Sequence, residues 1–117
     1  MKKILVVDDE AHIRQLYKDE LEEEGYDVLL AASGDEALKV IESEHIDLVM
    51  LDIKMPDING LEILGKIKEI NDKLPVILVS AYDTYKQDFT SWVAEDYIVK
   101  SSDLNEIKEK VKKFIEI

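Results

Sequence analysis

The chain has 117 residues, no cysteine, and a formal net charge of −12 from 27 Asp and Glu against 15 Lys and Arg. This length suits one domain with its own core, and the absence of thiols excludes disulfides, thiolate metal sites and a cysteine nucleophile. No apolar stretch reaches the roughly 18 residues of a membrane span, and the N-terminal apolar run is too short for a signal peptide, so we expect a cytoplasmic protein without membrane contact.

The first part of the chain alternates between buried strands and amphipathic helices. A β-branched run over 3–7 predicts a strand that ends at three consecutive acids, Asp8, Asp9 and Glu10. The next segment predicts a helix that ends at Gly25 in a left-handed cap. Its inward residues are expected to be Ile13, Leu16, Tyr17 and Leu21. Residues 27–32 predict a second strand.

The pattern continues through a second helix and a third strand. Residues 33–36 read Ser-Gly-Asp-Glu, a capping box that opens the second helix. Its buried side is expected to contain Ala37, Leu38 and Ile41. Residues 48–51 are apolar without alternation, which is typical of a parallel strand covered on both faces. Asp52 would then stand at the carboxyl end of that strand.

The rest of the chain predicts two further strands and three helices. Asn59 is a good N-cap for the third helix, and residues 76–79 predict a fourth strand that ends at Ser80. The inward residues of the third helix are expected to be Leu61, Leu64 and Ile67, with Ile63 and Ile70 as further candidates. A weak pattern over 82–92 predicts a short or mobile fourth helix.

The last predicted elements are a strand at 97–99, which ends at Lys100, and a helix capped by Ser101, Ser102 or Asp103. The inward residues of this helix are expected to be Leu104, Ile107, Val111, Phe114 and Ile115. Five strands in alternation with five helices predict one α/β domain over 1–117, a doubly wound parallel sheet.

Polar residues are expected to converge at one edge of this sheet. Parallel strands end at a common rim, where open α/β sheets bind ligands. The predicted strand ends carry Asp8 and Asp9, Asp52, Ser80 and Lys100. Each has an ordinary structural explanation alone, as a helix cap, a turn residue or a solvated charge. Their convergence favours a functional site.

Crowded carboxylates repel one another, and a hard divalent cation such as Mg²⁺ relieves that repulsion. Zinc or copper is a poor alternative because the chain has only two separated histidines, His12 and His45, to which we assign no role. A carboxylate beside Mg²⁺ can attack phosphorus to form an aspartyl phosphate. The Lys100 ammonium and the Ser80 hydroxyl are groups that stabilise the charge on phosphoryl oxygens.

Four motifs together resemble the receiver domain of two-component response regulators, of the chemotaxis-type single-receiver kind. They are Val7-Asp8-Asp9-Glu10, residues 51–60 (LDIKMPDING), Ser80-Ala81 and Tyr97-Ile98-Val99-Lys100. The resemblance runs along the whole chain and implies a flavodoxin-like strand order of 2-1-3-4-5. It also implies a signalling switch rather than an enzyme, limited to Mg²⁺-dependent self-phosphorylation and self-dephosphorylation.

The resemblance further implies that Asp52 accepts a phosphoryl group from a sensor histidine kinase or phosphotransfer protein. Asp8, Asp9, Asp52 and the backbone carbonyl of Lys54 would surround Mg²⁺. Ser80 and Lys100 would then bind the phosphoryl oxygens, and Tyr97 would turn inward. These changes would alter the face of the fourth helix, fifth strand and fifth helix, where an unknown downstream protein binds.

The sequence departs from the family at two places. Ser101 follows Lys100 where the family usually has a proline in a cis peptide, and Ala94-Glu95 replaces a Gly-Ala pair before the fifth strand. Without the resemblance, Tyr97 is most simply an aromatic half-buried against the last helix. The acidity of the whole chain argues against direct nucleic-acid binding.

Three alternative functions compete with the phosphorylated switch. A receiver-like docking module would never accept phosphate, although the intact set of acids argues against it. A phosphatase of the haloacid-dehalogenase type would need its two aspartates two residues apart after the first strand, whereas here the acids are adjacent. A flavin-binding module would need a Gly- and Ser/Thr-rich phosphate loop where this chain has acids.

Overall fold

The structure is a computed structural model, and it describes residues 1–53, 59–80, 94–99 and 103–115. Five strands and four helices lie within the described residues. They are β1 (Lys3–Val7), α1 (Ala11–Glu23), β2 (Asp27–Ala31), α2 (Gly34–Ser43), β3 (Leu48–Asp52), α3 (Gly60–Ile70), β4 (Val76–Ser80), β5 (Asp96–Val99) and α4 (Leu104–Ile115). The predicted fourth helix at 82–92 lies outside the described residues, so the last helix carries the label α4.

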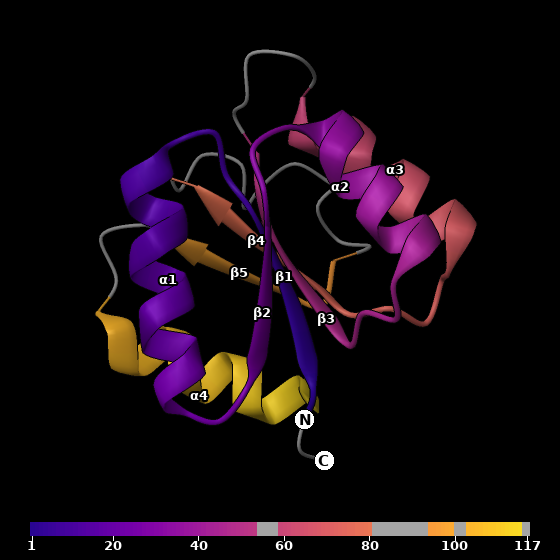
Figure 1. Ribbon diagram of the computed structural model, residues 1–117. Helices are drawn as coiled ribbons and strands as arrows, with labels where there is room; N and C mark the ends of the chain where they lie inside the picture. Colours follow the sequence, from indigo (N-terminus) through magenta and orange to yellow (C-terminus); the bar gives the residue numbers. More distant parts are fainter. Residues whose placement is uncertain (54–58, 81–93, 100–102, 116–117) are drawn as a thin grey trace.

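The five strands form one parallel sheet in the order β2-β1-β3-β4-β5. This confirms the predicted α/β class and strand order. In Figure 1 the sheet stands between two pairs of helices, with α1 and α4 on one face and α2 and α3 on the other. The order reverses at β1 and β3, which run side by side with Val7 paired with Leu51. Those two strands therefore bring Asp8 and Asp52 to the same edge.

Two apolar cores fill the layers between sheet and helices. Alternate residues of each strand enter opposite cores, as the pleat of a strand requires. Tyr17 and Leu21 of α1 and Ile107 of α4 pack in one core, and Ile63 and Leu64 of α3 pack in the other. β3 and β4 are buried at every position. This confirms that the central strands are covered on both faces.

The helix ends follow the predicted capping chemistry. Gly25 has φ 93°, and its N–H donates to the carbonyl of Glu22 at 3.0 Å, which closes α1. The Ser33 hydroxyl accepts from the N–H of Glu36 at 3.2 Å, and the Asn59 side chain accepts from the N–H of Leu61 at 2.7 Å. The Asp103 carboxylate caps α4 through the N–H of Glu106 at 2.9 Å.

Two residues predicted to face inward are exposed. Leu16 is 41% exposed because the buried stripe of α1 follows Tyr17 and Leu21, and at roughly 100° per residue Leu16 lies off that stripe. Ile70 is 44% exposed because it is the last residue of α3. These two predictions are wrong. None of the described helices is long and apolar enough to cross a bilayer.

Two lysines from opposite faces of the sheet hold the start of the edge strand β5. Lys68 of α3 contacts both carboxylate oxygens of Glu95, at 2.6 and 3.0 Å, and the same carboxylate accepts from the N–H of Val76. Lys110 of α4 contacts Asp96 at 3.1 Å and the carbonyl of Tyr97 at 3.0 Å. Glu95 therefore ties α3, β4 and the start of β5 together.

Candidate functional site

Three polar side chains are buried at the carboxyl ends of the central strands. Among the described residues, Asp8, Asp52 and Ser80 are the buried charged or polar ones, each at most 3% exposed. Asp8 follows Val7 and Asp52 follows Leu51, which are paired across β1 and β3. Burial of a carboxylate costs free energy unless it is compensated, and it is therefore a feature of functional sites. All three are residues that the sequence assigned to the site.

Asp8 is fixed by hydrogen bonds at its N–H, its carbonyl and its carboxylate. Its N–H donates to the carbonyl of Ala31 at 3.1 Å. Its carbonyl accepts from Nη1 of Arg14 at 2.7 Å, and its Oδ1 accepts from the N–H of Glu10 at 2.9 Å. The turn from β1 into α1 is therefore ordered around Asp8. This role of Arg14 was not predicted from the sequence, although Arg14 is the only arginine in the chain and lies one helical turn after the acids.

An acidic cluster suited to a divalent cation lies at this turn. Oxygen atoms of Asp8, Asp9 and Glu10 all lie within 4.8 Å of one another. Asp8 is buried, whereas Asp9 and Glu10 are exposed. Mg²⁺ takes oxygen ligands at 2.0–2.1 Å and usually uses one or two carboxylates with several waters. The donor set fits Mg²⁺, and it adds Glu10 as a candidate ligand to the ligands that the sequence predicted.

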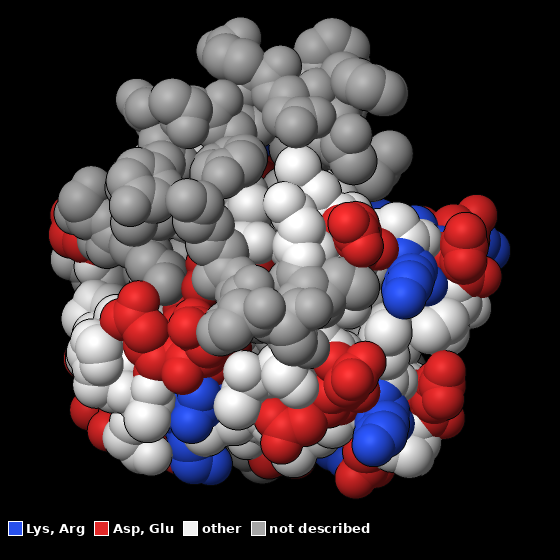
Figure 2. Space-filling view, turned by 90° about the horizontal axis from the view of Figure 1, so that it is seen from above, with Lys and Arg blue, Asp and Glu red and all other residues white. Residues whose placement is uncertain are grey.

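Figure 2 views the molecule from above the orientation of Figure 1 and shows acidic side chains in several groups on the described surface. At the turn between β1 and α1, Nε2 of His12 lies 3.3 Å from Oε2 of Glu10. His12 itself is an exposed residue of α1.

Ser80 and Tyr97 share the other face of the sheet. Along β4, Val76 and Leu78 belong to the core of the α2 and α3 side, so alternation assigns Ser80 to that face. Tyr97 is half-buried against the same core and pairs with Leu78 in the sheet. Asp52, by the same alternation, belongs to the opposite face with Met50. The expectation that Tyr97 is half-buried is confirmed, but its ring lies against the core of α2 and α3 rather than that of the last helix.

Two residues assigned to the site from the sequence, Lys54 and Lys100, lie outside the described residues, as does the bond between Lys100 and Ser101. Their assignments stay predictions.

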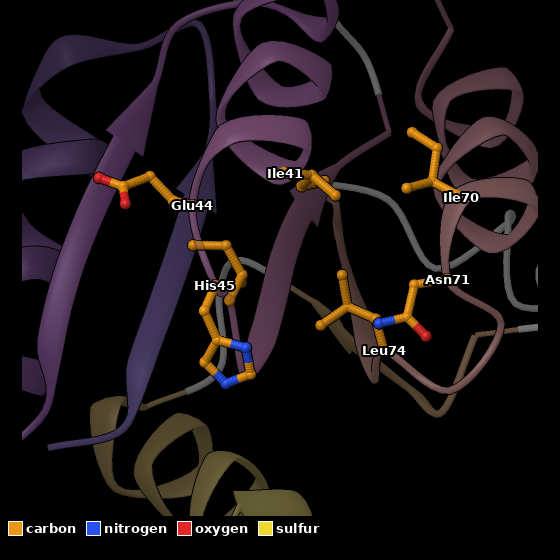
Figure 3. A pocket seen from close by; sticks show the side chains of 7 residues that line it. Ile41, Glu44, His45, Ile70, Asn71 and Leu74 are labelled. Carbon is orange, nitrogen blue, oxygen red and sulfur yellow. The ribbon is translucent and has the colours of Figure 1, made fainter.

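A hollow of about 290 Å³ lies at the opposite end of the sheet (Figure 3). Ile41 of α2, Ile70 of α3 and Leu74 just before β4 surround it, and His45 stands at its edge. Leu74 comes before the start of β4, whereas the acidic cluster follows the end of β1. In a parallel sheet these are opposite ends, so the hollow is separate from the acidic cluster.

His45 pairs with Asp47 in this region, with Nε2 and Oδ1 2.8 Å apart, and the other carboxylate oxygen accepts from the N–H of Lys3 at 2.8 Å. Burial raises the pKa of Asp47, but the hydrogen bonds from Lys3 and His45, with the charges of His45 and Lys2, together lower that pKa below its usual value. This carboxylate therefore serves the fold, because it ties the loop before β3 to the start of β1.

The comparisons with known proteins agree with this geometry. Residues 4–112 match the family model described as response regulator receiver domain. Among curated proteins, the chain is 38% identical to sporulation initiation phosphotransferase F of Bacillus subtilis over 116 residues, covering 97% of this chain and 94% of that protein. The chain spans about half the length of other curated relatives, such as the 37% identical transcriptional regulatory protein PhoP of the same organism, of which it covers 47%.

Solved structures of response regulators match the chain at higher sequence identity. Response regulator TrrA of Thermotoga maritima in complex with Mg²⁺ and BeF is 53% identical, with a TM-score of 0.94 over 97% of this chain and 99% of that one. TrrA in complex with the histidine kinase ThkA is 52% identical, with a TM-score of 0.92 over 98% of this chain and 99% of that one. By its sequence and its fold, this chain belongs to the response regulator receiver domain family.

Proposed function

We propose that Asp52 accepts a phosphoryl group from a sensor histidine kinase or phosphotransfer protein, with Mg²⁺ held by the acids beside it. One observation carries the proposal: Asp52 and Asp8 are both buried, at neighbouring positions where the strand order reverses. The TrrA structures support it, since that relative was solved with Mg²⁺ and BeF and with a histidine kinase.

The proposed chemistry follows from the groups at the rim. An oxygen of the Asp52 carboxylate attacks phosphorus, the bond from phosphorus to the donor imidazole nitrogen breaks, and the bonding electron pair stays on that nitrogen. Asp8, Asp9, Asp52 and the carbonyl of Lys54 would hold Mg²⁺, which would supply positive charge beside the phosphoryl oxygens. Lys100 supplies a further positive charge. Asp8 is ordered before the ion binds, which lowers the cost of assembling the site.

The proposed switch uses the residues on the other face. Ser80 turns at the end of β4 to donate to a phosphoryl oxygen, and the space behind it admits the Tyr97 ring. The shared face of Ser80 and Tyr97 supports this coupling, because strand alternation assigns Ser80 to the face of the sheet on which Tyr97 packs against the core. The change alters the surface made by the fourth-helix region, β5 and the last helix, where a downstream protein binds. Its size is limited by the difference in phosphoryl contacts between the two states.

Residues 1–117 form one receiver domain that acts as a switch. Its only catalysis is self-phosphorylation and self-dephosphorylation. Phosphoryl transfer to Asp52 takes place in the cytoplasm, where a kinase has access to ATP. The net charge of −12 supports a protein partner rather than nucleic acid, because a phosphate backbone is repelled.

The test is phosphoryl transfer to the intact protein, followed by mass spectrometry. Wild type, Asp52→Asn and Asp47→Asn are incubated with Mg²⁺ and acetyl phosphate, and then with a purified histidine kinase and ATP. Asp47 is the matched control because it is a part-buried carboxylate at the other end of the sheet. We expect one base-labile phosphoryl adduct on wild type and on Asp47→Asn, and none on Asp52→Asn.

Two other results would replace the proposal. An unchanged mass with every donor indicates a docking module that does not use phosphate. Steady release of phosphate from many monoesters, without an accumulated adduct, indicates an aspartyl phosphatase.

A further inference from the structure

Arg14 is the only arginine in a chain of net charge −12, and it lies next to the acidic cluster. Its Nη1 donates to the main-chain carbonyl of Asp8 at 2.7 Å. Arg14 belongs to the first turns of α1, so this contact runs backwards from the helix onto the end of β1. The guanidinium therefore links α1 to the turn that carries Asp8, Asp9 and Glu10.

The turn that Arg14 closes is held by side chains of its own acids and of α1. Glu10, the N-cap of α1, makes no side-chain capping hydrogen bond, and the first turn of the helix contains no acid. Instead, the Asp8 carboxylate accepts from the N–H of Glu10, and the Arg14 side chain satisfies the carbonyl of Asp8. A buried carbonyl at the end of a strand needs such a partner, since it has left the sheet ladder. Loss of Arg14 removes that partner directly at Asp8.

We infer that Arg14 is a positioning residue for the divalent cation, which deepens the proposed function and rests on it. It holds Asp8, Asp9 and Glu10 in the arrangement that the ion requires, before the ion arrives. Preorganised side chains bind an ion more tightly because they lose less conformational entropy when it binds. Arg14 itself contacts neither the ion nor the phosphoryl group.

Because Arg14 is positively charged, the direction of the change in Mg²⁺ affinity on its removal tests the inference. A cation near Mg²⁺ repels it, so removal of that charge alone would strengthen Mg²⁺ binding. The positioning role predicts the opposite, because the turn loses its tie. Lys18→Met is the matched control: Lys18 also lies on α1 and contacts a main-chain carbonyl, that of Val28 at 3.5 Å, as well as Glu22 at 3.1 Å.

The experiment measures the Mg²⁺ dissociation constant by calorimetry for wild type, Arg14→Met, Arg14→Lys and Lys18→Met. We expect Arg14→Met to bind about five-fold more weakly, Arg14→Lys to lie between it and wild type, and Lys18→Met to match wild type or bind slightly more tightly. At saturating Mg²⁺, Arg14→Met accepts phosphate from acetyl phosphate to the same final extent as wild type.

Equal or tighter Mg²⁺ binding by Arg14→Met overturns the inference, and so does a loss of adduct that saturating Mg²⁺ does not restore. If Arg14→Met does not fold by circular dichroism, Arg14→Lys decides: affinity equal to wild type overturns the inference, and weaker affinity supports it. Failure of the proposed function looks different, because wild type itself would then bind no Mg²⁺ or take up no phosphoryl group.

Discussion

At the scale of single residues, the acids at the rim divide into two kinds. Asp8 and Asp52 are at most 3% exposed, whereas Asp9 and Glu10 are exposed at the same edge. A buried carboxylate held by main-chain groups keeps its position, and an exposed one reorients at little cost. This combination suits an ion that must bind and leave, because one part of its shell is preset and the other adapts.

Asp47 provides a residue-scale prediction about pH. We expect Asp47→Asn to lower the free energy of unfolding by about 1 kcal/mol near neutral pH, because a charge-assisted hydrogen bond becomes a neutral one. The pKa of Asp47 is lowered in the folded protein. Its carboxylate therefore stabilises the fold above the unfolded-state pKa of about 3.9, and this contribution is lost as the pH falls through the lower folded-state value. Urea unfolding at several pH values measures the difference.

The difference between wild type and Asp47→Asn is expected to disappear in the acidic range, where Asp47 is protonated and resembles Asn. Asp72→Asn, a change of an exposed acid in the loop before β4, is the control and should show no such pH dependence. A difference that persists undiminished in acid would mean that the charge of Asp47 is not what stabilises the fold.

At the scale of elements, the start of α3 lies against the end of β3, beside Asp52. The N–H of Gly60 donates to the carbonyl of Ile53 at 2.6 Å, so the first residue of α3 lies directly against the end of β3. A Cβ atom at position 60 would meet the carbonyl oxygen of Asp52 and would lie 2.6 Å from the Cα of Ile53. Only glycine permits this approach of two backbones.

Gly60→Ala is therefore expected to lower the free energy of unfolding by about 2 kcal/mol and to slow phosphorylation of Asp52. The control is Gly65→Ala in the same helix, where an added Cβ meets nothing within 4 Å. That change should raise the free energy of unfolding by about 0.5–1 kcal/mol, because alanine favours the helix. Urea unfolding and the rate of adduct formation measure both. Equal stability of the two variants would show that the close approach at Gly60 is relaxed without cost.

Helices and strands were easier to predict from the sequence than the contacts between them. The motifs around Gly25, Ser33 and Asn59 act over three or four residues, so local chemistry determined where helices begin and end. The contact of Lys68 with Glu95 joins residues 27 apart in the chain, and no local pattern indicates it. The missed role of Arg14 has the same cause, since its acceptor is a main-chain carbonyl that every residue carries.

At the scale of the whole molecule, the alternation of strands and helices was enough to predict the parallel sheet and the edge that carries the site. Asp8, Asp52 and Ser80 lie at that edge, as predicted, and the structure adds that all three are buried. The assignment of Ser80 to the face opposite Asp52 was not predicted, because motif spacing gives the strand end but not the direction of a side chain. That direction depends on the register of β4 against β3, in which Asp52 pairs with Val79.

The net charge of −12 gives a prediction for the molecule as a whole. Added NaCl should raise the thermal midpoint, because screening weakens the repulsion among the acids. MgCl₂ at the same ionic strength should raise it further, since an ion that binds the folded state stabilises it by about 1.4 kcal/mol at ten times its dissociation constant. In Asp8→Asn, the response to NaCl should remain while the excess from Mg²⁺ is lost. If Asp8→Asn kept that excess, Mg²⁺ would be acting on the diffuse charge of the surface, and the stabilising site would not be the cluster at the end of β1.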